Sequence, residues 1–81
     1  MNVRLYGRLA DLLGEQVRLD VPAEGCSVAE LRRIVARAHP AAATAILGPG
    51  VRAIVGDDVV GDAHMVEAGD RVEFFPPVSG G

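Results

Sequence analysis

The sequence predicts an α+β roll, in which one main helix lies across one face of a mixed sheet. Two observations lead to this class. Short segments that alternate apolar and polar residues, the pattern of half-buried strands, lie on both sides of a longer segment with helical periodicity. The 81 residues suit one core and are too few for two, so we expect a single domain over residues 1–81.

Residue alternation predicts strands at residues 2–6, 16–22 and 70–75, and β-branched residues bounded by turn residues predict two more at 51–55 and 59–60. Pro22 lacks an N–H group and should end the second strand. The third and fourth strands should form a hairpin in which Gly56 or Asp57 takes a positive φ. The last strand runs directly into Pro76 and Pro77.

The main helix should begin after Ser27, which has the capping-box spacing to Glu30. Its apolar face is expected to consist of Val28, Leu31, Ile34, Val35 and Ala38. Pro40 should stop it. Shorter helical turns are expected at residues 8–14, with Gly14 as a left-handed cap, and at residues 41–47.

Charge composition limits the classes of partner. The net charge is −3, so the chain lacks the overall positive charge of a nucleic-acid binder, and a basic-faced protein partner is favoured. All eight basic residues are arginine, which excludes lysine chemistry and isopeptide attachment to a lysine of this chain. Three of them, Arg32, Arg33 and Arg37, are expected to form a solvated edge of the main helix, with contact to an acidic partner as the alternative.

Cys26 is the one cysteine, so the sequence offers neither an internal disulfide nor a zinc thiolate cluster. With no secretory leader and no membrane-spanning run, we expect a soluble cytoplasmic protein that does not bind membranes. His39 and His64 are isolated, and Asp57-Asp58 suit a solvated turn, so no metal site is assigned. We expect Cys26 to be a small structural residue.

The segment after the last strand is the most specific feature. Pro76 and Pro77 each hold φ near −65° and favour an extended course, so residues 76–81 are expected to protrude as a flexible tail. The tail then continues with slender residues: Val78, Ser79, Gly80 and Gly81. These can reach roughly 13 Å and pass through a narrow channel. A frayed end without function is the alternative.

Such a tail offers chiefly its carboxylate, on Gly81. A carboxylate is a poor acyl donor, but adenylation by ATP would make it open to attack by sulfur or nitrogen. The sequence has no Ser-His-Asp set, P-loop or glycine-rich nucleotide loop, so we expect no catalytic machinery in the chain itself.

Phe75 is expected beside the exit of the tail. It shares the outward parity of Arg71 and Glu73 in the last strand, which places its ring on the solvent side. Exposed aromatic residues of this kind mark interfaces. Local packing under the two prolines is the alternative.

Three segments of the chain resemble the MoaD/ThiS family of ubiquitin-like sulfur carriers. They are "RLADLLG" after the first strand, "SVAELRRIV" at the main helix and "FFPPVSGG" at the end. The resemblance covers essentially the whole chain and is greatest to the small subunits of molybdopterin synthases. It implies a β-grasp fold. Ser79 stands where the family often has Thr, and Gly56 where many members have Asn.

The resemblance also implies a role in molybdenum cofactor biosynthesis. An E1-like adenylating enzyme would use ATP to activate Gly81, which follows Gly80, and a sulfur donor protein would convert it to a thiocarboxylate. The sulfur would then pass to a pyranopterin precursor in the large subunit of molybdopterin synthase. The partner-binding residues would be Phe75, Pro76, Pro77, Val78 and Ser79. No cofactor bound to this chain is implied.

Other functions stay open. The sulfur could serve another pathway, such as thiamine thiazole or cysteine synthesis. The chain could instead be a ubiquitin-like modifier whose Gly81 forms an isopeptide bond with a lysine of another protein. A third possibility is a small adaptor domain without tail chemistry.

Overall fold

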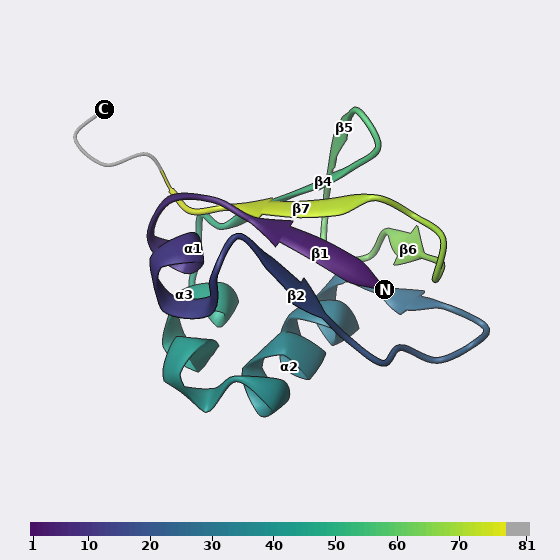
Figure 1. The fold of residues 1–81 in the computed structure, drawn as a ribbon. Coiled ribbons are helices and arrows are strands. Elements are labelled where there is room, and N and C mark those ends of the chain that lie inside the picture. The colour runs from purple at the N-terminus through teal and green to yellow at the C-terminus, as the bar shows by residue number, and fades with distance from the viewer. Residues whose placement is uncertain (78–81) are drawn as a thin grey trace.

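The computed structural model describes residues 1–77, which form a sheet with helices packed against one face (Figure 1). In chain order the elements are β1 (Asn2–Leu5), α1 (Gly7–Leu13), β2 (Gln16–Arg18), β3 (Cys26–Ser27), α2 (Val28–Ala38), the 3-10 turn η1 (Pro40–Ala42), α3 (Ala43–Leu47), β4 (Arg52–Val55), β5 (Asp58–Val60), β6 (Met65–Val66) and β7 (Val72–Phe75). All five expected strands and all three expected helical segments are present. The small strands β3 and β6 are additional.

The main sheet is mixed, as predicted, with strand order β2-β1-β7-β4-β5. Its central pair, β1 and β7, is parallel, with Val3 opposite Val72 and Leu5 opposite Phe74. The other neighbours in this sheet are antiparallel. The C-terminal strand therefore lies in the middle of the sheet, and the chain leaves the fold from there (Figure 1).

The core lies between the inner face of the sheet and α2. Its members with 2% exposure or less include Val3, Leu5, Leu9, Val28, Leu31, Val35, Ile46, Ala53, Val66, Val72 and Phe74. The strand residues among them follow the predicted alternation, because successive side chains of a strand point to opposite faces. The expected apolar face of α2 is correct except at its last position, since Ala38 is exposed at the end of the helix.

Only half of the predicted capping box forms at α2. The Ser27 hydroxyl accepts a hydrogen bond from the Glu30 N–H at 3.1 Å. The Glu30 carboxylate does not return to Ser27, because it is engaged by Arg33 at 3.1 Å and Arg37 at 3.5 Å. The helix start is held instead by the 61–64 segment, where the His64 carbonyl accepts from the Val28 N–H at 2.9 Å.

Smaller differences from the sequence predictions concern the ends of elements. Strand β2 ends at Arg18, before the expected Pro22, although Leu19 beyond it is buried. Gly14 has the expected positive φ, 88°, but its ψ of 171° lies outside the left-handed helical region. Gly56 takes the positive φ expected in the β4–β5 hairpin. Within residues 1–77 no helix has the length and apolar character needed to cross a membrane.

We expect Leu31→Ala to lower the free energy of unfolding by about 2–5 kcal/mol, because it leaves a cavity under α2 where the side chain is fully buried. The matched control is Leu47→Ala, at a side chain 50% exposed, with an expected loss below about 1 kcal/mol. Urea unfolding of both variants checks this. Equal losses would contradict the assignment of the core.

Candidate functional site

The chain leaves the sheet through residues 75–77, which we call the tail root. Pro76 packs on Gly7 at the start of α1, where an added Cβ would lie 2.9 Å from Pro76 Cγ. Pro77 packs on Gly50 in the loop before β4, where an added Cβ would lie 3.1 Å from Pro77 Cβ. Both glycines have positive φ, 56° and 87°, which other residues rarely adopt, and a Cβ would clash with Pro76 at Gly7 and lie tightly against Pro77 at Gly50. The two prolines are therefore supported from two sides.

An aromatic pair precedes the prolines. The rings of Tyr6 and Phe75 are stacked, with centroids 4.1 Å apart and planes 4° from parallel. Tyr6 directly follows β1, and Phe75 is the last residue of β7. The parallel pairing of these strands therefore brings the two rings together. Phe75 has the predicted outward parity, opposite the exposed Arg52, but it is half-buried against Tyr6 and not free in solvent.

The Tyr6 hydroxyl donates a hydrogen bond to the Glu73 carboxylate, two residues before Phe75. This bond raises the pKa of the Tyr6 phenol above its ordinary value of 10.0, because it is lost when the phenol ionises. Desolvation and the negative charge of Glu73 act in the same direction. The bond joins the end of β1 to β7 beside the ring stack.

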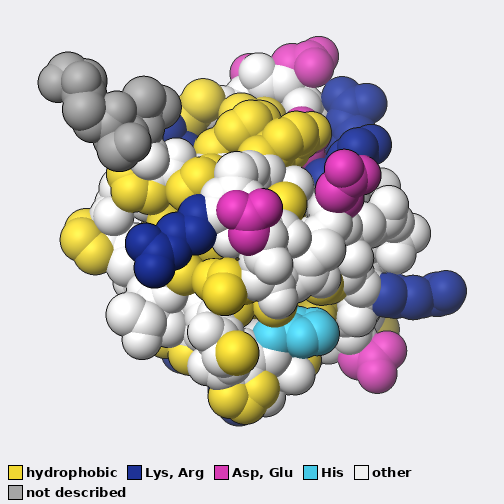
Figure 2. All heavy atoms as spheres, turned by 60° about the vertical axis from the view of Figure 1, so that its left-hand side comes forward, with side chains coloured by type: hydrophobic (Ala, Val, Ile, Leu, Met, Phe, Trp, Pro, Cys, Tyr) yellow, Lys and Arg dark blue, Asp and Glu magenta, His cyan; other side chains and the backbone are white. Residues whose placement is uncertain are grey.

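The outer face of the sheet borders the tail root. Strand register places one row of side chains across it: Gln16, Arg4, Glu73, Ile54 and Val59. Val59 is 61% exposed, and Ile54 and the aromatic pair are half-buried, so the face includes an apolar strip. Figure 2 shows hydrophobic side chains gathered on this side of the molecule, with charged side chains beside them.

The charge of the outer face differs from the charge of the whole chain. Four exposed arginines lie on it or at its margin: Arg4, Arg18, Arg52 and Arg71. Of these, Arg71 contacts Asp57 at 3.4 Å. The expectation of a basic-faced partner came from the net charge of −3, whereas this face carries four arginines beside Glu73 and Asp57 and would suit carboxylates on a partner.

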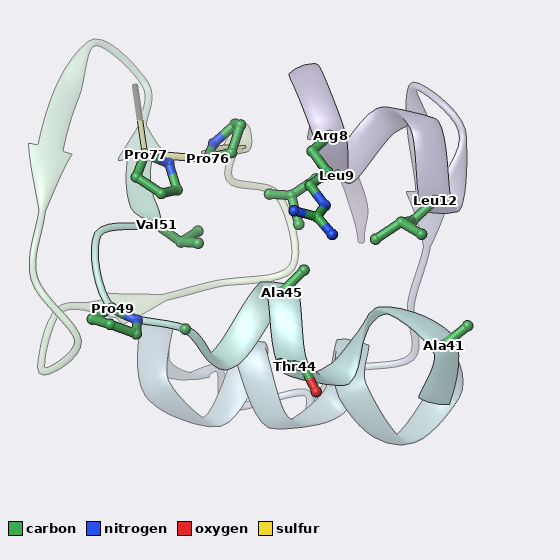
Figure 3. Close-up of a pocket in the computed structure, with 11 residues that line it drawn as sticks. Arg8, Leu9, Leu12, Ala41, Thr44, Ala45, Pro49, Val51, Pro76 and Pro77 are labelled. Atoms are coloured by element: carbon green, nitrogen blue, oxygen red, sulfur yellow. The ribbon is translucent and has the colours of Figure 1, made fainter. Parts of the chain in front are cut away.

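A groove lies on the other side of the tail root. It has a volume of about 370 Å³ and runs between α1 and α3, with Pro76 and Pro77 at one end (Figure 3). Leu9, Leu12 and Ala45 line it, and Arg8 is its charged residue. The lining is mainly apolar; among the described residues Thr44 supplies its one side-chain hydroxyl, and no acid–base pair accompanies it.

The remaining candidates from the sequence are not brought together. Cys26 is buried in β3, and this burial, followed by the charge of Glu30, raises the pKa of its thiol, so the thiolate is disfavoured. Within residues 1–77 no three His, Cys, Asp or Glu side chains form a group that could hold a metal ion. Asp57 and Asp58 are exposed at the β4–β5 turn, as expected.

Four predicted site residues lie outside the described residues: Val78, Ser79, Gly80 and Gly81. Sequence reasoning missed Tyr6, Gly7 and Gly50, which support the tail root. A signal existed for Gly7, because glycine is a poor helix former and yet begins α1. Arg32, expected at a solvated edge, has a side chain only 11% exposed.

The fold and the tail root together define a class. A mixed sheet that packs on one main helix, with the C-terminal strand at its centre and a proline-led exit beside an apolar strip, is a ubiquitin-like β-grasp domain. The chain belongs to the ThiS family, whose model matches residues 3–81. The family resemblance and the β-grasp fold expected from the sequence are both confirmed.

Solved structures of similar fold come from archaea. SAMP1 from Haloferax volcanii is 28% identical with a TM-score of 0.83, over 99% of this chain and 97% of that chain. A protein described as molybdopterin converting factor, subunit 1, from Pyrococcus furiosus is 26% identical with a TM-score of 0.79, over 95% of each chain. A structure of H. volcanii small archaeal modifier protein 1 has a TM-score of 0.78 over 95% of each chain. Its sequence is 24% identical to this chain, so it supports the fold alone. No curated protein matches the sequence.

We expect spectrophotometric titration of Tyr6, the one tyrosine of the chain, to give a midpoint above pH 10. Glu73→Gln should lower this midpoint toward the ordinary value, because the acceptor loses its charge. Since the folded-state pKa is raised, the stabilisation from this bond is complete below pH 10 and is lost as the pH rises through the folded pKa. Glu67→Gln, at an exposed site in the turn after β6, is the control. A midpoint that is the same in all three proteins would contradict the Tyr6–Glu73 bond.

Proposed function

We propose that this protein is a sulfur carrier whose C-terminal carboxyl group, on Gly81, is converted to a thiocarboxylate. The observation that carries the proposal is the tail root. The last strand is central in the sheet, and the two prolines after it are supported by Gly7 and Gly50. A firm base followed by slender residues suits a chain end that must enter another protein's active site. Membership of the ThiS family supports the same chemistry.

The proposed chemistry has two steps. The Gly81 carboxylate attacks the α-phosphate of ATP in the activating enzyme, which releases pyrophosphate and leaves an acyl adenylate. In the second step the outer sulfur of a persulfide on the donor protein attacks the acyl carbon and AMP departs, which leaves an acyl disulfide. A thiol of the donor system then attacks the donor-side sulfur, the S–S bond breaks, the thiocarboxylate leaves and a new disulfide forms. The chain supplies the acyl group and its partners supply the catalytic residues.

We propose molybdopterin synthesis as the pathway, with this chain as the small subunit of molybdopterin synthase. The Pyrococcus furiosus neighbour, described as a molybdopterin converting factor subunit, favours this pathway over thiazole or cysteine synthesis. The thiocarboxylate sulfur would attack the pyranopterin precursor inside the large subunit. The large subunit, the E1-like adenylating enzyme and the sulfur donor are then the three protein partners.

The outer sheet face is the proposed docking surface for these partners. It adjoins the tail root, so a partner seated on it would have the tail directed toward its own interior. The face pairs an apolar strip, which includes Phe75, Ile54 and Val59, with exposed arginines. A complementary partner would have an apolar centre and carboxylates at its rim.

A second function is favoured by a different observation. The neighbour with 28% identity, SAMP1, belongs with the small archaeal modifier proteins, so this chain could donate Gly81 to an amino group of another protein. The acceptor lysine would have to belong to the other protein, because this chain has no lysine. Both functions require the same activation of Gly81 and differ in the nucleophile that follows.

The proposal is tested by incubating the protein with an E1-like adenylating enzyme, ATP and a sulfur donor, and measuring its intact mass. We expect an increase equal to one oxygen-for-sulfur exchange, located at Gly81. Gly81→Ala, and a variant with one residue added after Gly81, should lose this product almost completely while their melting temperatures stay unchanged, because the terminal residues contribute little to the core. Adducts on foreign lysines without sulfur exchange would favour the modifier function. Full activity of the extended variant would contradict both functions.

If partners dock on the outer face, a substitution in that face should weaken their binding. Phe75→Ala should weaken binding to the large synthase subunit by about tenfold or more, because it removes an aromatic anchor at the tail root. Tyr6→Phe is the control, since it keeps the ring stack and removes only the hydroxyl. Titration calorimetry of the three proteins provides the test. Equal affinities for wild type and Phe75→Ala would exclude this face as the docking surface.

A further inference from the structure

Arg32 occupies an environment unlike that of the neighbouring arginines of α2. Its side chain is 11% exposed, whereas those of Arg33 and Arg37 are 55% and 67% exposed and, among residues 1–77, pair only with Glu30. The Arg32 guanidinium points from α2 toward the sheet, where its Cζ lies 5.4 Å from the ring centroid of Phe74. Such a position requires partners for its donors.

The donors of Arg32 bind three separate segments. Nε donates to the Asp62 carboxylate at 3.0 Å, and the two terminal nitrogens donate to the backbone carbonyls of Ile46 at 3.1 Å and Val51 at 2.6 Å. Ile46 is in α3 and Val51 immediately precedes β4. The two carbonyls therefore bracket residues 47–50, the end of α3 and the turn after it, which we call the 47–50 loop, and one planar group holds both ends of it.

This loop supports the tail root. Gly50, the residue before Val51, packs directly on Pro77. The cation–π contact connects the same guanidinium to Phe74, the residue of β7 that precedes the root. Arg32 is thus connected to the tail root in two ways. It binds the loop that packs on Pro77, and it contacts Phe74 in the strand that leads to the root.

A contribution to stability alone does not account for a guanidinium at this place. Desolvation of a charge offsets much of the gain from its ion pair, and apolar side chains of similar volume often stabilise such a site as well. What an apolar side chain cannot do is fix two backbone carbonyls at a set separation. The geometry therefore suits a role in positioning.

We infer that Arg32 is a positioning residue for the tail root: it fixes the 47–50 loop so that Gly50 holds Pro77. The catalytic consequence rests on the proposed function, in which Gly81 must reach the active site of the adenylating enzyme. The effect on the Gly50–Pro77 contact does not depend on that function.

The first test uses the protein alone. Nuclear Overhauser contacts between Gly50 and Pro77, and between Gly7 and Pro76, should both be present in the wild type and in the control Arg33→Gln. In Arg32→Gln and Arg32→Lys the Gly50–Pro77 contact should be lost while the Gly7–Pro76 contact remains. Persistence of the Gly50–Pro77 contact in both folded Arg32 variants would overturn the inference. If Arg32→Gln fails to fold, Arg32→Lys, which keeps the charge and loses the planar fork, decides the test.

The second test measures kcat and KM for adenylation. We expect kcat to fall about tenfold in the folded Arg32 variants with KM within about twofold of wild type, because docking is intact and the reacting group is misplaced. Gly50→Ala, which disturbs Pro77 without touching Arg32, should behave in the same way, and Arg33→Gln should match wild type. Unchanged kcat in Arg32→Lys and Gly50→Ala would overturn the inference. A wild type that is never adenylated would instead refute the proposed function, and the first test would then decide the positioning role by itself.

Discussion

Parallel pairing of β1 with β7 is the constraint on which the rest of this structure depends. Two parallel neighbours need a long crossover between them, and the chain supplies it with α2, which packs its buried side chains on the inner face of the sheet. Because the two strands run in the same direction, their ends meet at one edge. Tyr6 and Phe75 stack there, and Gly7 and Pro76 follow them in contact. The site is thus a direct result of the topology.

The same pairing gives the last described residues of the chain a firm base. Strand β7 has hydrogen-bonded neighbours on both sides, and its Phe74 is fully buried, so the anchoring extends almost to the prolines. The prolines then remove backbone freedom at the point where the strand ends. In the proposed function this arrangement lets the protein carry sulfur on its last residue and present it to another enzyme. Its chemistry depends on the enzymes that receive the tail.

Sequence reasoning was most successful where a pattern is local. Alternation located the strands, and the spacing of Val28, Leu31 and Val35 located the buried face of α2. It failed where the cause is tertiary. Strands β3 and β6 have two residues each and no readable alternation, and they form because the start of α2 docks on the 62–64 segment. Helical periodicity did not predict the burial of Arg32, because its partners, the Asp62 carboxylate and the carbonyls of Ile46 and Val51, come from segments distant in the sequence.

In the candidate site, too, local features could be predicted from the sequence and tertiary contacts could not. The outward parity of Phe75 followed from β7 alone, but its stack on Tyr6 required the parallel register of two strands that are distant in the sequence. The supports at Gly7 and Gly50 likewise arise from contacts across the fold. Net charge averages over the surface and could not predict that the face beside the tail root is rich in arginine.

The central claim is that the end of this chain is a reagent charged with sulfur. Top-down mass spectrometry of the protein, isolated from cells that produce it under conditions that preserve thioacids, tests this claim most directly. The account predicts a fraction of molecules that carry a thiocarboxylate on the last glycine. A population that carries only an ordinary carboxylate, in cells that are actively making molybdopterin, would contradict it.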